Sequence, residues 1–165
     1  MRFRLRAGIA LAATSLFVTA GAQATTSVSS FAQGWVQSTG ASDGASNGNN
    51  TFTGNETFDR FNSWAAFNIP VGHYGHAQLD VRPLIFPLGN PSIYLIQIYD
   101  VNTPYSAFSS ISPGVAVYTD LRSGVLYGGA NMSNSPVNVA LSSAAVSDIN
   151  AASGSIFIVG FTKRP

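Results

Sequence analysis

The residue types that most often carry enzymatic chemistry are sparse in this chain. His73 and His76 are its two histidines, three positions apart in a glycine-rich turn, and there is no cysteine. Two imidazoles could share a metal ion, but a zinc site needs three or four ligands, and no His-Glu-x-x-His frame surrounds this pair. A Ser-His-Asp arrangement would have to draw on the same two histidines. We therefore expect solvent-exposed turn residues here, with no catalytic residues, no metal site and no enzymatic activity.

Acidic residues offer two weaker alternatives. Glu56 and Asp59 lie three positions apart and could act as the acid and base of a glycoside hydrolase. The simpler interpretation is that one of them pairs with Arg60 or lines a turn. Asp43 with the asparagines of residues 47–50 could supply oxygen ligands to a structural Ca²⁺, although no Asp-x-Asp-x-Asp-Gly loop is present. We expect a plain turn there and no cofactor.

One segment, from Arg60 to Pro70, has the clearest pattern of a core strand. Its apolar residues, such as Phe61 and Phe67, alternate with polar ones, which predicts one buried face and one largely polar face. Trp64 has the opposite parity to Phe67, so it either packs under a covering loop or lies on an exposed sheet face. Sugars stack on flat aromatic side chains. If the sheet binds a ligand, the candidate residues are Arg60, Asn62, Trp64, Asn68 and Tyr74.

The first 24 residues have the three parts of a secretory signal peptide. Arg2, Arg4 and Arg6 form a basic region, residues 7–20 form a short apolar run, and Ala22-Gln23-Ala24 provides small residues for cleavage after Ala24. The run is shorter than the roughly 20 residues of a membrane-spanning helix. We therefore expect export, to the periplasm or the extracellular space, of a single domain over residues 25–165 without a membrane anchor.

The composition of this domain argues against some classes of partner and favours others. The whole chain has eight basic and seven acidic residues; the three signal-peptide arginines leave five basic residues against seven acidic ones. No basic patch remains for nucleic acid, whose binding requires several phosphates to be neutralised. Without cysteine, stability must come from the core rather than from disulfides. A surface rich in hydroxyl and amide groups is typical of proteins that contact sugars or a polar matrix.

The remaining patterns predict an all-β chain with one short helix near the C-terminus. Residues 76–86 alternate, 93–101 are apolar enough for a strand buried on both faces, and 156–161 form a last strand. Residues 115–122 favour a short helical turn. Ser142 or Ser143 can cap a helix over 144–152 that Gly154 ends. About seven to nine short strands, separated by Gly, Pro and Asn turns, indicate a β-sandwich, jelly-roll-like in form.

Several motifs occur in the same order in a group of bacterial exported proteins. They include Gly34-Trp35, Gly54, Arg60-Phe61, Phe67-Asn68-Ile69, Tyr99-Asp100-Val101-Asn102-Thr103-Pro104, Tyr118-Thr119-Asp120-Leu121 and the segment 144–152. The chain resembles the uncharacterised secreted β-sandwich domains of PEP-CTERM proteins, which an exosortase sorts. The resemblance implies a jelly-roll-like fold and a setting related to matrix or carbohydrate, and it assigns no catalytic residues.

The end of the chain departs from that group. The Val-Pro-Glu-Pro signature, membrane helix and basic tail of the group are replaced here by Phe161-Thr162-Lys163-Arg164-Pro165, so we expect release rather than anchoring. The sequence therefore predicts a secreted, non-catalytic structural or interaction protein of the bacterial cell envelope or extracellular matrix. Its partner would be an extracellular polysaccharide or the matrix itself. The alternatives are a carbohydrate-binding module and, third, a glycoside hydrolase.

Overall fold

The computed structural model describes residues 9–20, 24–43, 52–55, 60–85, 94–132 and 135–163. The strands are β1 (Ile9–Ala20), β2 (Ala24–Val28), β3 (Ser30–Gln37), β4 (Phe52–Asn55), β5 (Arg60–Asn68), β6 (His76–Ile85), β7 (Tyr94–Asp100), β8 (Leu126–Met132), β9 (Val137–Ala140) and β10 (Ile156–Lys163). The helices are the 3₁₀ helix η2 (Tyr105–Ser109), α1 (Val115–Asp120) and α2 (Ser143–Ala151).

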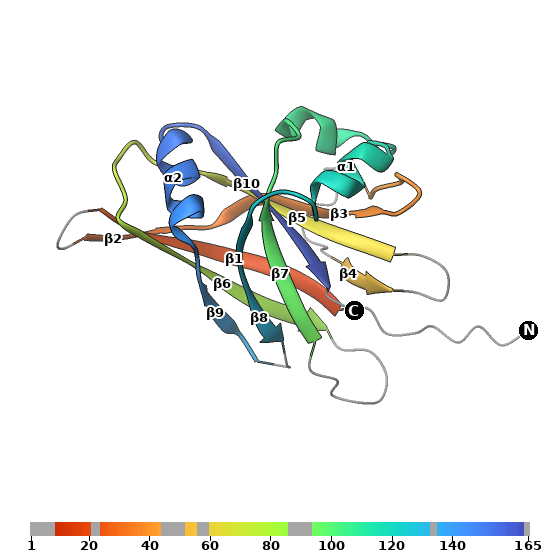
Figure 1. Cartoon of the computed structure of the whole chain (residues 1–165), viewed down its shortest axis with the longest axis horizontal. Coiled ribbons are helices and arrows are strands. Elements are labelled where there is room, and N and C mark those ends of the chain that lie inside the picture. Colours follow the sequence, from red (N-terminus) through yellow and green to blue (C-terminus); the bar gives the residue numbers. More distant parts are fainter. Residues whose placement is uncertain are drawn as a thin grey trace, which may run out of the picture.

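These strands form two antiparallel sheets (Figure 1). One has the order β3-β5-β10-β7-β8, and the other has the order β2-β1-β6-β9. The short strand β4 pairs with β5 of the first sheet and β1 of the second, and so joins them. The chain passes repeatedly from one sheet to the other, as in a sandwich. The predicted all-β sandwich is confirmed, with nine strands from Ala24 onward.

A single large core lies between the two sheets. Strand β5 contributes Phe67, β6 contributes Leu79 and β10 contributes Phe161, and each of these side chains is fully buried. Helix α2 closes this core next to β6 and β8, with Ile149 fully buried. The predicted alternation of β5 therefore places the expected face in the core.

A second apolar cluster lies on the other face of β5. Residues 101–121, which we call the cover, carry η2 and α1 across this face, and Figure 1 shows both helices beside β3 and β5. The cover contributes Phe108 and Leu121, and β5 contributes Trp64; all three are fully buried. The first sheet is thus packed on both faces along β5.

The helices agree closely with their sequence signals. Ser142 caps α2, since its Oγ accepts a hydrogen bond from the N–H of Ala145, and Gly154 follows the helix with a φ of 77°. The predicted helical turn at 115–122 is helix α1. In the described part of the chain, neither α-helix has the length and apolarity needed to cross a bilayer.

Strand β7 differs from the prediction that both of its faces are buried. Ile96 and Ile98 are buried in the central core, but Gln97 and Tyr99, which point to the other face, are only partly buried. The Tyr99 hydroxyl donates a hydrogen bond to Gln97 Oε1 at 3.1 Å on that face. The cover reaches the β5 side of the sheet, so a polar pair can remain near solvent on β7.

Gly160 in β10 provides a test of the packing between the sheet and the cover. A Cβ atom at this position would lie 2.5 Å from the carbonyl oxygen of Leu121 and 2.9 Å from its Cα. Because backbone cannot move aside cheaply, we expect Gly160→Ala to lower the free energy of unfolding by about 1–3 kcal/mol. Urea denaturation measures this loss. Gly75→Ala is the matched control, because a Cβ there meets nothing within 4 Å, and an equal effect of the two variants would contradict the packing argument.

The predicted signal peptide overlaps a strand of the structure. Strand β1 lies between β4 and β6, and its Leu16 is fully buried in the central core. Cleavage after Ala24 would remove this strand and leave β6 paired with β9 alone. Cleavage therefore remains a prediction. The structure describes the uncleaved chain, in which β1 is present, and the predicted product of cleavage would lack this strand.

We expect the exported product to begin at Thr25 and to fold without β1. The sheet β3-β5-β10-β7-β8 and the cover lie outside the removed segment, and Leu79, Val81 and Val139 still pack on this sheet. The open edge of β6 should make residues 25–165 more prone to associate than the full chain. Intact mass of the exported protein and circular dichroism of residues 25–165 test this. An exported product that retains residues 9–20 would contradict it.

Candidate functional site

The five residues predicted to bind a ligand do not form one surface. Arg60 and Asn68 are exposed, whereas Asn62 and Tyr74 are each 2% exposed and Trp64 is fully buried. Arg60 and Asn68 are the first and last residues of β5. At about 3.3 Å per residue, they lie roughly 26 Å apart along the strand. A binding role for Arg60 or Asn68 stays a prediction. Because of their separation, the two residues would not contact the same small ligand.

Trp64 packs beneath the cover, which is one of the two arrangements that its parity allowed. Its ring lies 4.6 Å from that of Phe108 and 6.2 Å, edge-on, from that of Tyr105, measured between centroids. The neighbouring Asn62 donates a hydrogen bond from Nδ2 to the carbonyl oxygen of Tyr118 at 3.0 Å. Both side chains therefore attach the cover to β5 and present no surface to a ligand.

Tyr74 is also held within the fold. Its hydroxyl donates to the carbonyl oxygen of Pro70 at 2.7 Å, and its backbone N–H donates to Asn150 Oδ1 at 2.7 Å. Asn150 Nδ2 returns a hydrogen bond to the Tyr74 carbonyl oxygen at 2.9 Å. This reciprocal pair ties the turn after β5 to helix α2.

The other chemical candidates do not come together in the described residues. His73 and His76 are exposed, and no group of three or more His, Asp or Glu side chains forms a metal site in this part of the chain. The Glu56–Asp59 pair and the asparagines of the 47–50 segment lie outside the described residues. The sequence also contains one Gly-x-Ser-x-Gly pattern at 40–44. Ser42 lies in the loop after β3 and bridges to Val36, not on the strand-to-helix turn of a nucleophile elbow.

A cavity of about 580 Å³ is the best candidate site. It lies where the end of β7 and the start of the cover meet the C-terminal half of α2 and the start of β10. Its polar lining residues are Asp100, Asn102, Thr103, Tyr105, Tyr127, Asp148 and Ser155, and its apolar wall includes Ile156, Phe157 and Ile158. Lysine, arginine and histidine are absent from the described lining.

Asp100 reaches the cavity from the last position of β7. Its backbone N–H donates to the Val125 carbonyl oxygen at 3.0 Å, and its carboxyl group occupies the space that a side chain on Gly124 would need. Asn102 Nδ2 donates to Asp100 Oδ2 at 3.4 Å. Asp100 Oδ1 is buried and has no hydrogen-bond partner among the described residues. This oxygen packs against Gly124, so it is held by the contact between β7 and the 124–125 segment and is not itself offered to a ligand.

Tyr127 and Asp148 form the second polar element of the cavity. The Tyr127 hydroxyl donates to Asp148 Oδ2 at 2.6 Å, and its ring stacks on Phe157 at 5.9 Å. Burial raises the pKa of Tyr127 well above its usual value, and the hydrogen bond to Asp148 and the charges of Asp148 and Asp100 raise it further. The phenol therefore stays protonated and keeps donating to Asp148.

The loop from Asn102 to Tyr105 is fixed from the cover side. Asp120 Oδ2 accepts hydrogen bonds from both the backbone N–H and the hydroxyl of Thr103, each at 2.7 Å. The cavity thus combines two carboxylates, two tyrosines and an apolar wall. Such a site can accept hydrogen bonds from hydroxyl or ammonium groups and can pack against an apolar ring face.

Sequence analysis missed this cavity. Asp100 follows an apolar strand and Asp148 lies in the last helix, both within motifs that carry the family resemblance, but neither position suggests a partner by spacing. Only the packing of α2 beside β8 brings Tyr127 and Asp148 together. The signal available was a pair of acidic residues inside otherwise apolar or small-residue segments.

Comparison of the chain with protein-family models, with curated proteins and with solved structures finds no match.

Tyr127 provides a test of the cavity geometry. Because its hydroxyl donates to Asp148 while the side chain is only 2% exposed, we expect Tyr127→Phe to cost about 1 kcal/mol of unfolding free energy. Tyr99→Phe is the matched control, since its hydrogen bond to Gln97 is on a partly exposed face. The raised pKa of Tyr127 gives a second measurement. Tyr127→Phe should leave unchanged the tyrosinate absorbance that develops near pH 10, and loss of one tyrosine's share would contradict the buried donor.

Proposed function

We propose that this chain is an exported, non-catalytic interaction protein of the bacterial cell envelope or extracellular matrix, and that it binds its partner through the cavity at Asp100, Tyr127 and Asp148. The observation that carries the proposal is the combination of two acidic residues, Asp100 and Asp148, with an apolar wall in the lining of one cavity. Export is supported by the signal-peptide pattern of residues 1–24. The likeness to secreted PEP-CTERM-type domains supports the same setting.

The composition supports a polar partner rather than nucleic acid or an apolar peptide. Charged residues make up 9% of the chain, and the cavity presents two carboxylates without a basic residue. Phosphate groups would be repelled by these carboxylates. The carboxylate oxygens would instead accept hydrogen bonds from hydroxyl groups.

Carbohydrate binding is the specific form of this function that the cavity favours. Sugars offer many hydroxyl donors and one apolar ring face, and the cavity offers carboxylate acceptors next to Tyr105, Phe157 and Ile158. The strand surface of β5 provides no aromatic platform, because Trp64 is buried. A sugar-binding role is therefore assigned to the cavity.

We expect a polysaccharide or glycan array to show saturable binding that the double variant Asp100→Asn, Asp148→Asn weakens at least tenfold. The substitutions remove both carboxylates from the cavity while keeping side-chain volume, so loss of binding would report on the acceptors. Circular dichroism confirms that the variant is folded.

The matched control is the double variant Arg60→Ala, Asn68→Ala, which alters the exposed ends of β5 and leaves the cavity intact. Binding lost in this control and kept in the cavity variant would move the site to the strand. Turnover of a glycoside that disappears in the cavity variant would replace the interaction function with hydrolysis. Absence of binding to every glycan would contradict the carbohydrate form of the proposal.

A further inference from the structure

Three buried side-chain atoms in the described residues have no hydrogen-bond partner. Two of them belong to residues that are far apart in the sequence but lie close together in the fold. Besides Asp100 Oδ1, they are Asp43 Oδ2 and Trp64 Nε1. An indole N–H is a donor and a carboxyl oxygen can accept. A complementary donor and acceptor are thus left unpaired near each other in one interior region.

Gly34 on β3 is the place where these two side chains meet. A Cβ atom on Gly34 would lie 2.9 Å from Asp43 Oδ1 and 3.0 Å from Trp64 Nε1. Both side chains therefore pack closely on Gly34, and they can do so because residue 34 has no side chain of its own. Trp64 is fully buried, so its indole N–H has no route to bulk water.

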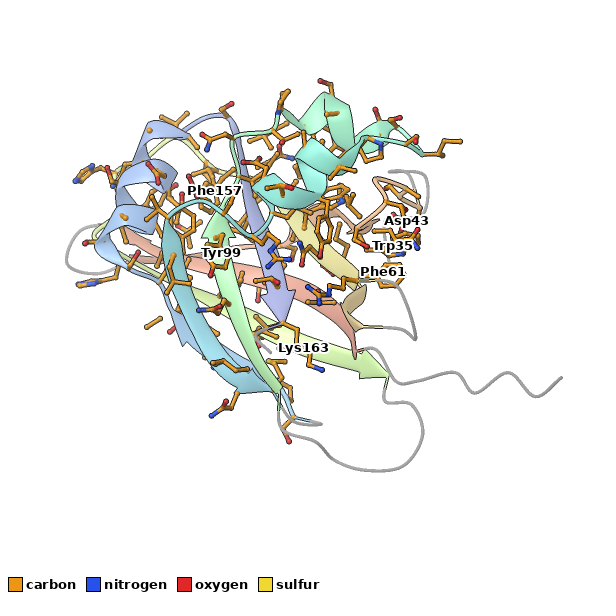
Figure 2. The ribbon with its side chains drawn as sticks, turned by 45° about the vertical axis from the view of Figure 1, so that its right-hand side comes forward. Trp35, Asp43, Phe61, Tyr99, Phe157 and Lys163 are labelled. Carbon is orange, nitrogen blue, oxygen red and sulfur yellow. The ribbon has the colours of Figure 1, made fainter. Side chains whose placement is uncertain are left out.

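The loop that carries Asp43 is joined directly to the cover. The Ser42 N–H donates to the Ile111 carbonyl oxygen at 3.0 Å, and the Gly114 N–H donates to the Gly40 carbonyl oxygen at 3.1 Å. The cover also places Phe108 on the Trp64 ring. Figure 2 shows Asp43 beside Trp35 and close to Phe61, at the end of the sheet where the loop and the cover meet. Asp43 is thus an ionisable group at the junction of β3, β5 and the cover.

We propose that Asp43 is a proton-dependent latch: its neutral carboxyl lets residues 38–43 close over Gly34 and Trp64, and its ionised carboxylate loosens that closure. The hydrogen bonds that hold the carboxyl are long. The Trp35 N–H and the Ser42 hydroxyl each donate to Oδ1 at 3.5 Å, and Oδ2 has no partner among the described residues. A partly buried negative charge with so little compensation is unfavourable.

Burial raises the pKa of Asp43 from 3.8 to about 6, and the hydrogen bonds from Trp35, Asp43 itself and Ser42 lower it less than burial raises it. Other ionisable groups on the packed elements are Arg60 on β5 and Tyr105, Tyr118 and Asp120 on the cover, and none of them is a cause of this shift. Because the pKa in the folded state is the higher one, the fold favours the neutral form. The stability contributed by Asp43 is complete below about pH 4 and is lost as pH rises through about 6.

The test follows the two indole N–H resonances by NMR from about pH 4 to pH 8 in a chain whose two histidines are replaced by glutamine. This background contains no histidine, the side chain whose ordinary charge change lies between pH 5 and 8. We expect the Trp64 resonance to titrate with a midpoint near 6 and to stop titrating in Asp43→Asn. Trp35, whose side chain is partly exposed, provides a second indole in the same molecule.

Thermal unfolding gives an independent readout. Asp43→Asn should unfold at a higher temperature than the parent at pH 7.5 and at the same temperature at pH 4, since the parent is then neutral at this position. A Trp64 midpoint near 4 in the histidine-free parent, a titration that persists in Asp43→Asn, or an equal difference in unfolding temperature at the two pH values would each overturn the latch. The midpoint of the histidine-free parent decides the question even if Asp43→Asn fails to fold.

Discussion

Burial of both faces of β5 is the constraint on which the rest of this structure depends. One face places Phe67 in the core between the sheets, and the other places Trp64 under Phe108 of the cover. Full burial of a large apolar side chain contributes about 1.5–3 kcal/mol to stability. Burial of these two faces therefore stabilises the packing of both the second sheet and the cover on β5. The polar residues between them must then find partners inside. Asn62 finds one in the Tyr118 carbonyl oxygen, whereas the Trp64 N–H has none among the described residues.

The sequence predicted those parts of the fold that local patterns determine. The parity of residues 61–69, the Ser142 cap and the glycine after α2 depend on neighbours within a few positions, and all three agree with the structure. The cover did not follow from local pattern. Asn62 and Tyr118 are 56 positions apart, and no periodicity connects them. Because no local pattern predicts the cover, the sequence did not show that Trp64, one of the candidate binding residues, is a core residue.

The candidate cavity also depends on contacts between residues far apart in the sequence, which local patterns do not predict. Asp100 and Asp148 are separated by helix, strand and loop, and their common cavity exists only because α2 packs beside β8. The N-terminal segment shows a different limit. A short apolar run satisfies the pattern of a signal peptide and that of a buried strand equally well, because periodicity alone does not separate them. Residues 9–20 match both descriptions, and whether the chain is exported and cleaved after Ala24, as the signal-peptide pattern predicts, would decide which one applies.

The cover physically connects the cavity with the half-buried carboxyl of Asp43. Its first residues, 101–105, line the cavity, and Tyr105 also contacts Trp64 edge-on. Its later residues, Ile111 and Gly114, bond to the loop that carries Asp43. A ligand in the cavity and a proton on Asp43 would therefore act on the same segment. If the two are coupled, linkage requires the coupling to be reciprocal: a ligand that prefers the closed cover must raise the affinity of Asp43 for its proton by the same factor by which the proton raises the affinity for the ligand.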